Sequence, residues 1–299
     1  MSPTALPRQE GGRRRLAYLL SAPASVLILL IYVLPIVAVF VISFTDYSLV
    51  YDGFDFVGLD NYKQMFTDEH FAEALKNTLI YAAIFIPGAF FLPLVLAIAI
   101  QRRRRFRSIL EVLYFMPVTS TLTAMTLVWR ALLDGNQGAI NNMLVGLGLD
   151  KVNWLGDGDI VLISIAMVSI WGIIGFNMVL FLAGLTVIPQ NLYEAASIDG
   201  ADHPLDRFFQ VTWPLLAPTS LFVSVNTLVT AFKLFDTVAV LTHGGPDRAS
   251  EVYLYLAYLE GFENFNMAYA CALSLVFLVV LFLVAWLQTR LGDRRRTQA

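Results

Sequence analysis

The side chains that could act in acid–base catalysis or bind a metal are few and lie far apart in this sequence. The three histidines are His70, His203 and His243, and the one cysteine is Cys271. A single cysteine cannot form an internal disulfide, and in an apolar segment it is most often an inert packing residue. We find no grouping of metal ligands and no nucleophile beside a base. The sequence therefore predicts no catalytic residue and no metal site.

Three pairs of opposite charge have a spacing that would place both side chains on one face of a helix. Ionisable groups inside apolar segments are costly, so each pair could be either a functional site or a structural ion pair. The pairs are Lys233 with Asp236, Arg130 with Asp134, and Arg107 with Glu111.

The elements that must position these side chains are long apolar segments. The chain has 299 residues, of which 58% are apolar and 14% charged, and its mean hydropathy is +0.67. This composition excludes a disordered chain, a nucleic-acid-binding tail and an ordinary cytosolic enzyme. Six apolar blocks are each long enough to cross a bilayer, which predicts an all-α integral membrane protein with six transmembrane helices. The blocks are Leu16–Ser43, Asn77–Ile100, Ile109–Leu133, Ile160–Ile188, Pro214–Thr242 and Met267–Leu291.

Two local features bear on these blocks. Prolines inside them, such as Pro87 and Pro117, predict kinks that neighbouring helices must accommodate. The first block follows Arg13–Arg15 and so resembles a signal peptide, but its apolar run exceeds the length of a signal core. We read it as a retained span, with a cleaved signal as the alternative.

The distribution of basic residues predicts the orientation. Fourteen of the Lys and Arg residues fall on the side that holds both termini and the links 101–108 and 189–213, whereas the opposite links hold four. The positive-inside rule places that basic side in the cytoplasm. The predicted organisation is therefore a cytoplasmic tail (1–15), a permeation domain (16–291) and a second cytoplasmic tail (292–299). The run Arg102–Arg105 suggests nucleic-acid binding, but we prefer an orientation signal beside anionic lipid and expect no nucleic-acid partner.

The link 189–213 is the most structured polar segment of the sequence. Pro189 can start a short helix and Gly200 can end it in a left-handed cap. His203 precedes a proline and should interrupt the helix, so that Pro204 starts a second one. The acidic and apolar side chains of this element predict a docking surface. A helix lying on lipid is the alternative; it would explain Phe208 and Trp213, but not Glu194 and Asp199.

These residues carry a resemblance to a known family. The segment from Glu194-Ala195-Ala196 to Gly200-Ala201 resembles the EAA loop of permeases in binding-protein-dependent ABC importers. The likeness extends over nearly the whole chain and is closest to the maltose/glycerol-phosphate permease family. The sequence departs from the family's pattern at Trp213, which replaces a leucine, and at Pro214, which lies one residue later than usual. The other agreeing segments are Ser43–Ser48, Val57–Tyr62, Lys76–Leu79, Lys233–Asp236, Leu241–Pro246 and Glu260–Phe265.

The resemblance implies a type I ABC importer permease fold and a set of partners. These are a second homologous permease in a heterodimer, two ABC ATPase subunits, an extracytoplasmic substrate-binding protein and membrane lipid. ATP and magnesium would bind to the ATPases, because this sequence has no Gly-x-x-x-x-Gly-Lys-Ser/Thr loop and binds no cofactor itself. The expected location is a bacterial inner membrane, as a multi-pass protein that is not an enzyme.

The resemblance also implies roles for single residues. In the EAA loop, Glu194 and Asp199 would contact basic groups of the ATPase, Ala195 and Ala196 would allow close approach, and Gly200 would supply the turn before Ala201. Phe208 and Phe209 would fill an apolar groove, or alternatively pack under the chain's own spans. Polar and aromatic residues of the deep spans could line a sugar path or form cross-helix contacts. These path candidates are Trp171, Phe176, Asn177, Asn226, Lys233 and Asp236.

Two other classes fit less well. A secondary transporter would need inverted repeats and ionisable coupling groups at mid-membrane, and we find no internal repeat. An intramembrane enzyme would need a catalytic dyad within the spans, but all three histidines lie in links. Residue patterns near Phe208 resemble glycerol-phosphate permeases somewhat more than maltose permeases. The sequence does not identify the solute.

Overall fold

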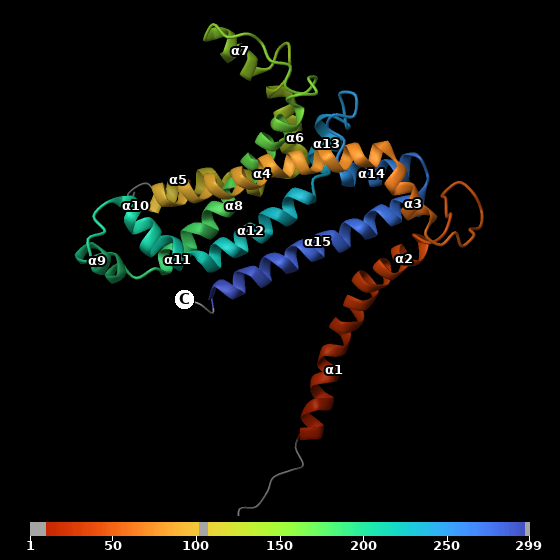
Figure 1. The fold of residues 1–299 in the computed structure, drawn as a ribbon, viewed down its shortest axis with the longest axis horizontal. Helices are drawn as coiled ribbons and strands as arrows, with labels where there is room; N and C mark the ends of the chain where they lie inside the picture. The colour runs from red at the N-terminus through yellow and green to blue at the C-terminus, as the bar shows by residue number, and fades with distance from the viewer. Residues whose placement is uncertain (1–9, 102–106, 297–299) are drawn as a thin grey trace, which may run out of the picture. The chain divides into compact units, whose positions relative to one another are not determined.

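The computed structural model describes residues 10–101 and 107–296, and these residues are almost entirely helices and short connections (Figure 1). Their one extended pairing is an isolated bridge between Thr45 and Phe56. The predicted all-α class is confirmed. Arg8, Arg102–Arg105 and the outermost residues of both predicted tails lie outside the described residues.

The chain divides into two compact units. One unit comprises residues 1–64 and 260–276, and the other comprises residues 65–259 and 277–299. Helix α15 (Met267–Arg296) contributes residues to both, and the π-helical turn η4 (Leu259–Glu263) lies at a boundary between them.

The first unit begins with a continuous helical segment formed by α1 (Glu10–Ile28), the π-helical turn η1 (Leu29–Val33) and α2 (Leu34–Ile42). A loop and α3 (Asp60–Thr67) follow. Buried Asn61 closes this loop, because its amide donates to the carbonyl oxygens of Ser43 at 2.9 Å and Thr45 at 2.7 Å. Further along, the Ser48 hydroxyl donates to the Phe265 carbonyl oxygen at 2.9 Å. Three of the segments that carry the resemblance therefore meet in one small structure.

The second unit contains the helices that position the candidate sites. Helix α4 packs along both α8 and α12 (Figure 1). In chain order the elements are α4 (Glu69–Gln101), α5 (Arg107–Phe115), the 3-10 turn η2 (Met116–Thr119), α6 (Leu122–Leu132), α7 (Ala139–Gly146), α8 (Val161–Val187), α9 (Gln190–Ile198), α10 (Pro204–Arg207), the π-helical turn η3 (Phe208–Thr212), α11 (Trp213–Leu215), α12 (Ala217–Phe232), α13 (Asp236–Leu241) and α14 (Tyr253–Tyr258).

Four helical segments in the described residues are long and apolar enough to cross a membrane, and the number is six if each of two bent pairs counts as one span. The four are Tyr18–Ile42, Glu69–Gln101, Val161–Val187 and Met267–Arg290. They correspond to the first, second, fourth and sixth predicted blocks. The third and fifth blocks are each a bent pair of helices, and the bend that follows Pro117 agrees with the kink predicted there.

The third block bends by 102° between the segment that ends at Thr119 and the one that starts at Thr123. Pro117 lies in the 3-10 turn, and Ser120 and Thr121 have extended backbone, so the helix cannot continue. Close packing accompanies the bend: a methyl group added to Gly175 of α8 would overlap the Tyr114 carbonyl oxygen. The prolines inside α4, Pro87 and Pro93, leave that helix unbroken.

The fifth block departs from the prediction, which ran from Pro214 to Thr242. Its long helix, α12, stops at Phe232, and the short helix α13 begins only at Asp236. At the other end, α12 makes an angle of 73° with the Pro204–Leu215 segment. The bend lies at Leu216 and not at Pro214, which is inside α11.

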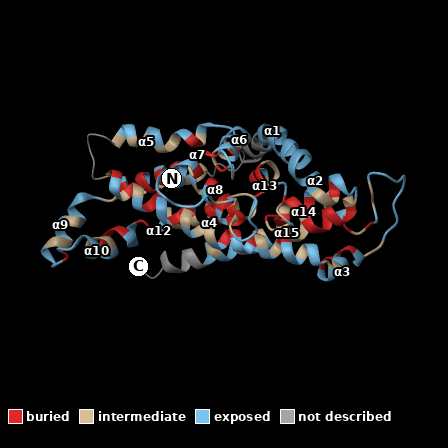
Figure 2. Cartoon of the chain, turned by 90° about the horizontal axis from the view of Figure 1, so that it is seen from above, coloured by how far each residue is buried: buried red, intermediate tan, exposed pale blue. Residues whose placement is uncertain are grey.

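Buried residues of the second unit concentrate on the facing sides of its long helices (Figure 2). One apolar cluster centres on Phe85, Ile165 and Val238, and another on Phe90, Phe181 and Leu216. Both clusters join α4 to α8, so these two helices form the frame on which the sites are built.

Candidate coupling element and solute cavity

The link 189–213 folds as the sequence predicts, as two short helices separated by a glycine turn. Pro189 precedes α9 in an extended conformation, and α9 ends in a left-handed turn in which Gly200 has φ +93°. The Ala201 amide donates to the Ala196 carbonyl oxygen at 2.9 Å and the Gly200 amide to Ser197 at 3.3 Å. This pattern is the Schellman cap, which satisfies carbonyl groups at the helix end. The turn depends on local residue types, which is why sequence alone could predict it.

The second half of the element begins at His203, as expected. Its side chain accepts a hydrogen bond from the Leu205 amide at 3.3 Å and so caps α10. The Arg207 Nε donates to the Ala201 carbonyl oxygen at 2.9 Å, which joins the second helix to the end of the glycine turn. We call residues 189–215 the coupling element from here on.

The exposed side of the coupling element combines carboxylates with large apolar side chains. Glu194, Ala195 and Asp199 are exposed, Ala196 is half-buried and Ala201 is buried. No ion pair is found for Glu194 or Asp199 within the part of the chain that the structure describes. Apolar side chains stand beside them, with Ile198 87% and Phe209 63% exposed.

Phe208 and Phe209 have different environments. Phe209 is exposed, whereas Phe208 is half-buried and packs against the cluster of Phe90, Phe181 and Leu216. Phe208 therefore follows the alternative expectation, packing under the chain's own spans. The reason is that neighbouring helical residues point in different directions, so only one of the two rings can face the core.

A cavity of about 250 Å³ lies between α4, α8 and the break that follows α12. Its wall includes the aromatic rings of Tyr81, Phe85 and Phe235 and the hydroxyl-bearing residues Ser169 and Thr230. The Ser169 hydroxyl is buried beside the Tyr81 side chain. Lys233 and Asp236 also line this space, which we call the solute cavity.

Of the two readings left open for Lys233 and Asp236, the structural ion pair is wrong. The prediction assumed one continuous helix, but the helix ends at Phe232 and the two residues belong to different segments. Both are exposed, and no ion pair within the described residues joins them. They instead place one positive and one negative group on the wall of the solute cavity.

The two other predicted charge pairs have opposite outcomes. Arg107 Nε and Glu111 Oε1 are 2.7 Å apart, which confirms that pair. Arg130 and Asp134 do not pair: Arg130 donates to the Val240 carbonyl oxygen at 3.4 Å. Asp134 lies beyond the end of α6 and accepts the amides of Gln137 at 2.8 Å and Asn136 at 3.0 Å. These hydrogen bonds hold the pKa of the Asp134 carboxyl below its usual value.

The remaining path candidates do not line the solute cavity. Asn177 is fully buried, and its amide donates to the Ala89 carbonyl oxygen at 2.7 Å and the Thr227 hydroxyl at 3.1 Å. It therefore makes the cross-helix contact that was the alternative expectation. Asn226 is half-buried on α12, and Trp171 and Phe176 are more than a third exposed on α8. Trp171 packs edge-on against Trp129.

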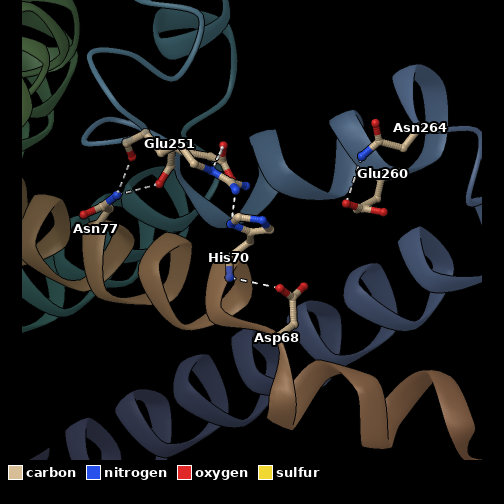
Figure 3. Close-up of polar contacts among 7 residues, drawn as sticks. Asp68, His70, Asn77, Glu251, Glu260 and Asn264 are labelled. Carbon is tan, nitrogen blue, oxygen red and sulfur yellow. Dashed lines mark hydrogen bonds and ion pairs between the residues drawn. The ribbon is translucent and has the colours of Figure 1, made fainter.

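The loop 242–252 is a structured site to which sequence reasoning assigned no role, although its first residues belong to a segment of the resemblance. Arg248 makes two hydrogen bonds to the buried carboxylate of Glu251, at 2.7 and 3.0 Å, and also contacts His70. The Asn77 amide donates at 3.0 Å to the carbonyl oxygens of both Arg248 and Glu251 (Figure 3). These contacts fix the loop to the start of α4. The signal available in the sequence was that two of the segments that carry the resemblance, Lys76–Leu79 and Leu241–Pro246, contain Asn77 and the first half of this loop.

Residues 14–297 match the family model described as binding-protein-dependent transport system inner membrane component. The chain belongs to this family. It is thus a permease of the binding-protein-dependent ABC importer class and a multi-pass membrane protein, and the resemblance found in the sequence is confirmed.

Similar proteins agree with this assignment. The permease is 33% identical over 277 residues to the probable ABC transporter permease protein YurN of Bacillus subtilis (strain 168), covering 91% of this chain and 94% of the relative. It is 31% identical over 283 residues to the sn-glycerol-3-phosphate transport system permease protein UgpA of Agrobacterium fabrum (strain C58 / ATCC 33970), covering 94% and 95%. A chain of the crystal structure of a bacterial ABC transporter involved in the import of the acidic polysaccharide alginate superposes with a TM-score of 0.83. That chain is 23% identical, with coverage of 95% and 96%, and it supports the type I permease fold.

Proposed function

We propose that this permease forms one half of the membrane pathway of an ATP-driven importer for a sugar or sugar-like solute. Its expected partners are a second, homologous permease, two ABC ATPases that bind ATP and magnesium, and an extracytoplasmic binding protein that delivers the solute. In this arrangement each bent pair counts as one span, giving six, and both termini lie in the cytoplasm of a bacterial cell. The observation that carries the proposal is the exposed acidic and apolar side of the coupling element.

The coupling element would transmit the ATPase motion. Glu194 and Asp199 offer carboxylates for charge-assisted hydrogen bonds with basic groups of an ATPase. Phe209 and Ile198 offer apolar surface that a groove would remove from water. The bend at Leu216 joins this element to α12, so displacement of the element would move a helix that lines the solute cavity. Closure of the ATPases would then favour an outward-open arrangement over an inward-open one.

The solute cavity has the chemistry of a sugar subsite. The half-buried ring of Phe235 can pack on the apolar face of a sugar, and the hydroxyl group of Thr230 can exchange hydrogen bonds with it. Lys233 can donate to a hydroxyl or phosphate oxygen, and Asp236 can accept from a hydroxyl. The relative named for sn-glycerol-3-phosphate transport fits a solute of this type. An oligosaccharide fits the same chemistry.

Glu194→Lys tests the coupling proposal in the complete transporter reconstituted into nanodiscs. We expect the variant to assemble but to lose the stimulation of ATP hydrolysis by the loaded binding protein. Glu73→Lys is the matched control, because Glu73 is an exposed glutamate of α4 outside the coupling element. Normal stimulation in Glu194→Lys would contradict the proposal.

A further inference from the structure

A second cavity, of about 760 Å³, opens beside the coupling element. Its wall is formed by the last turns of α4 and α8 and by residues of the coupling element. It shares no lining residue with the solute cavity, so the proposed transport path does not explain it.

This cavity lies where two membrane-crossing helices end. Val95 and Ile98 line it from the last two turns of α4, which stops at Gln101. At a rise of about 1.5 Å per residue, Val95 is about 9 Å along the axis from that end. Leu185 lines it two residues before the end of α8. The space therefore extends from the apolar part of the bilayer toward the headgroup region.

The lining combines apolar and polar side chains. Val95, Ile98 and Phe208 form apolar wall, while Gln101 and Tyr193 supply polar groups. Among the residues that the structure describes, Arg207 is the one charged residue of the lining, and none of them contributes a carboxylate to it. The cavity thus has the distribution of charge and apolar surface that an anionic amphiphile requires.

Arg207 can still bind a ligand. Its Nε is engaged by the Ala201 carbonyl oxygen, but its two terminal nitrogens have no hydrogen-bond partner within residues 10–101 and 107–296. The side chain is half-buried, and the bond at Nε fixes its position. A guanidinium presented in this way can donate two parallel hydrogen bonds to a phosphate group.

We propose that this cavity binds one anionic phospholipid, with its phosphate on Arg207 and an acyl chain along Val95 and Ile98. A free phosphate ion would leave the apolar wall exposed to water, and a neutral sugar would leave the charge of Arg207 uncompensated and would offer no alkyl chain to the aliphatic side chains of Val95 and Ile98. Basic pockets between membrane helices favour anionic headgroups for these reasons. Because Arg207 also bonds Ala201, next to Gly200, the bound lipid would steady the coupling element. This site does not depend on which solute is transported.

The test is lipid retention by the complete transporter, purified from nanodiscs that contain equal amounts of phosphatidylglycerol and phosphatidylcholine. Native mass spectrometry should show phosphatidylglycerol retained in preference to phosphatidylcholine. Arg207→Gln should reduce that preference about fivefold, the effect of one arginine near a membrane surface. Arg290→Gln is the matched control, since Arg290 is an exposed arginine of α15 that does not line the cavity.

A second variant separates lipid binding from misfolding. Val95 is exposed, so Val95→Trp would place a large ring in the cavity without disturbing the core. Arg207 and its hydrogen bond to Ala201 would stay intact. The variant should also release phosphatidylglycerol, while the complex keeps its unfolding temperature. Equal retention of the two lipids by the unmodified transporter would overturn the proposal. It would also be overturned if Arg207→Gln and Val95→Trp both kept the phosphatidylglycerol, or if retention appeared only after the ATPases were removed.

Discussion

The side-chain amide of Asn177 on α8 donates a hydrogen bond to the Thr227 hydroxyl on α12, 3.1 Å away, and both residues are fully buried. The same amide donates to the Ala89 carbonyl oxygen on α4 at 2.7 Å. One polar side chain therefore joins α4, α8 and α12.

Asn177→Leu should lower the stability of the purified permease because it removes both cross-helix hydrogen bonds. Such bonds contribute roughly 0.6 kcal/mol each in membrane proteins, so we expect a loss of about 1 kcal/mol. Unfolding in a mild detergent with increasing denaturant measures it. Asn226→Leu is the control, since Asn226 is half-buried. A changed solute affinity with unchanged stability would show instead that Asn177 contacts the solute.

Gly175→Ala should destabilise the permease, because the added methyl group would overlap the Tyr114 carbonyl oxygen and force α8 away from the end of α5. Overpacking of this kind costs about 1–3 kcal/mol. Gly172→Ala is a close control on the same helix, where the nearest atom, of Met125, is 3.9 Å from the added carbon. Thermal unfolding of the two variants side by side gives the comparison. Equal unfolding temperatures would mean that the helices do not approach closely at Gly175.

Gly200→Ala should loosen the coupling element. The residue has φ +93°, which costs an L-amino acid about 1–2 kcal/mol, although no neighbouring atom would clash. We expect faster hydrogen exchange at the Ala201 amide, because this amide donates a hydrogen bond to the Ala196 carbonyl oxygen within the turn. Gly146→Ala serves as the control, because Gly146 also has open space around it but ends α7 without a positive φ. Unchanged exchange in the Gly200 variant would argue against the left-handed turn.

Arg248→Leu should destabilise the loop 242–252 because it leaves the buried Glu251 carboxylate without its cation. Leaving a buried charged group unsatisfied costs about 2–3 kcal/mol. The double variant Arg248→Leu/Glu251→Leu should recover part of this loss, since apolar residues often replace an ion pair at little cost. Limited proteolysis of the loop in all three variants provides the measurement. A double variant as labile as the single one would show that the ion pair is not what holds the loop.

Acidification should loosen the turn 134–137. Its hydrogen bonds from Gln137 and Asn136 keep the pKa of Asp134 below the usual range, with a further contribution from Lys151. A carboxyl whose pKa is lower in the folded state stabilises the fold above its unfolded pKa and loses that effect as the pH falls through the folded value. The protection of the Gln137 amide, which is its exchange rate relative to that of an unstructured peptide at the same pH, should therefore decrease at acidic pH. Asp134→Asn should abolish this pH dependence, and a variant that retained it would assign the effect to another group.

Sequence by itself determined the features that depend on local composition. Four of the six apolar blocks located helices long enough to cross a membrane, because bilayer thickness fixes the number of apolar residues required. The two halves of the coupling element were marked by Pro189, Gly200 and Pro204. Proline fixes its own φ angle, and glycine readily adopts a positive φ, wherever either occurs in a chain. The ion pair of Arg107 with Glu111 was likewise predictable from local sequence, since the two residues lie one turn apart on the uninterrupted helix α5.

Tertiary structure alone decided the features that depend on distant partners. The break at Lys233–Phe235 separated a predicted ion pair and placed both charges on the solute cavity. Asn177 became a link between helices because Ala89 and Thr227, far away in the chain, meet it in the core. Hydropathy and residue spacing describe one segment of the chain at a time. They do not say which other segments it contacts. Packing between segments far apart in the sequence decides which side chains line a cavity together. The same packing decides which side chains form contacts between helices instead.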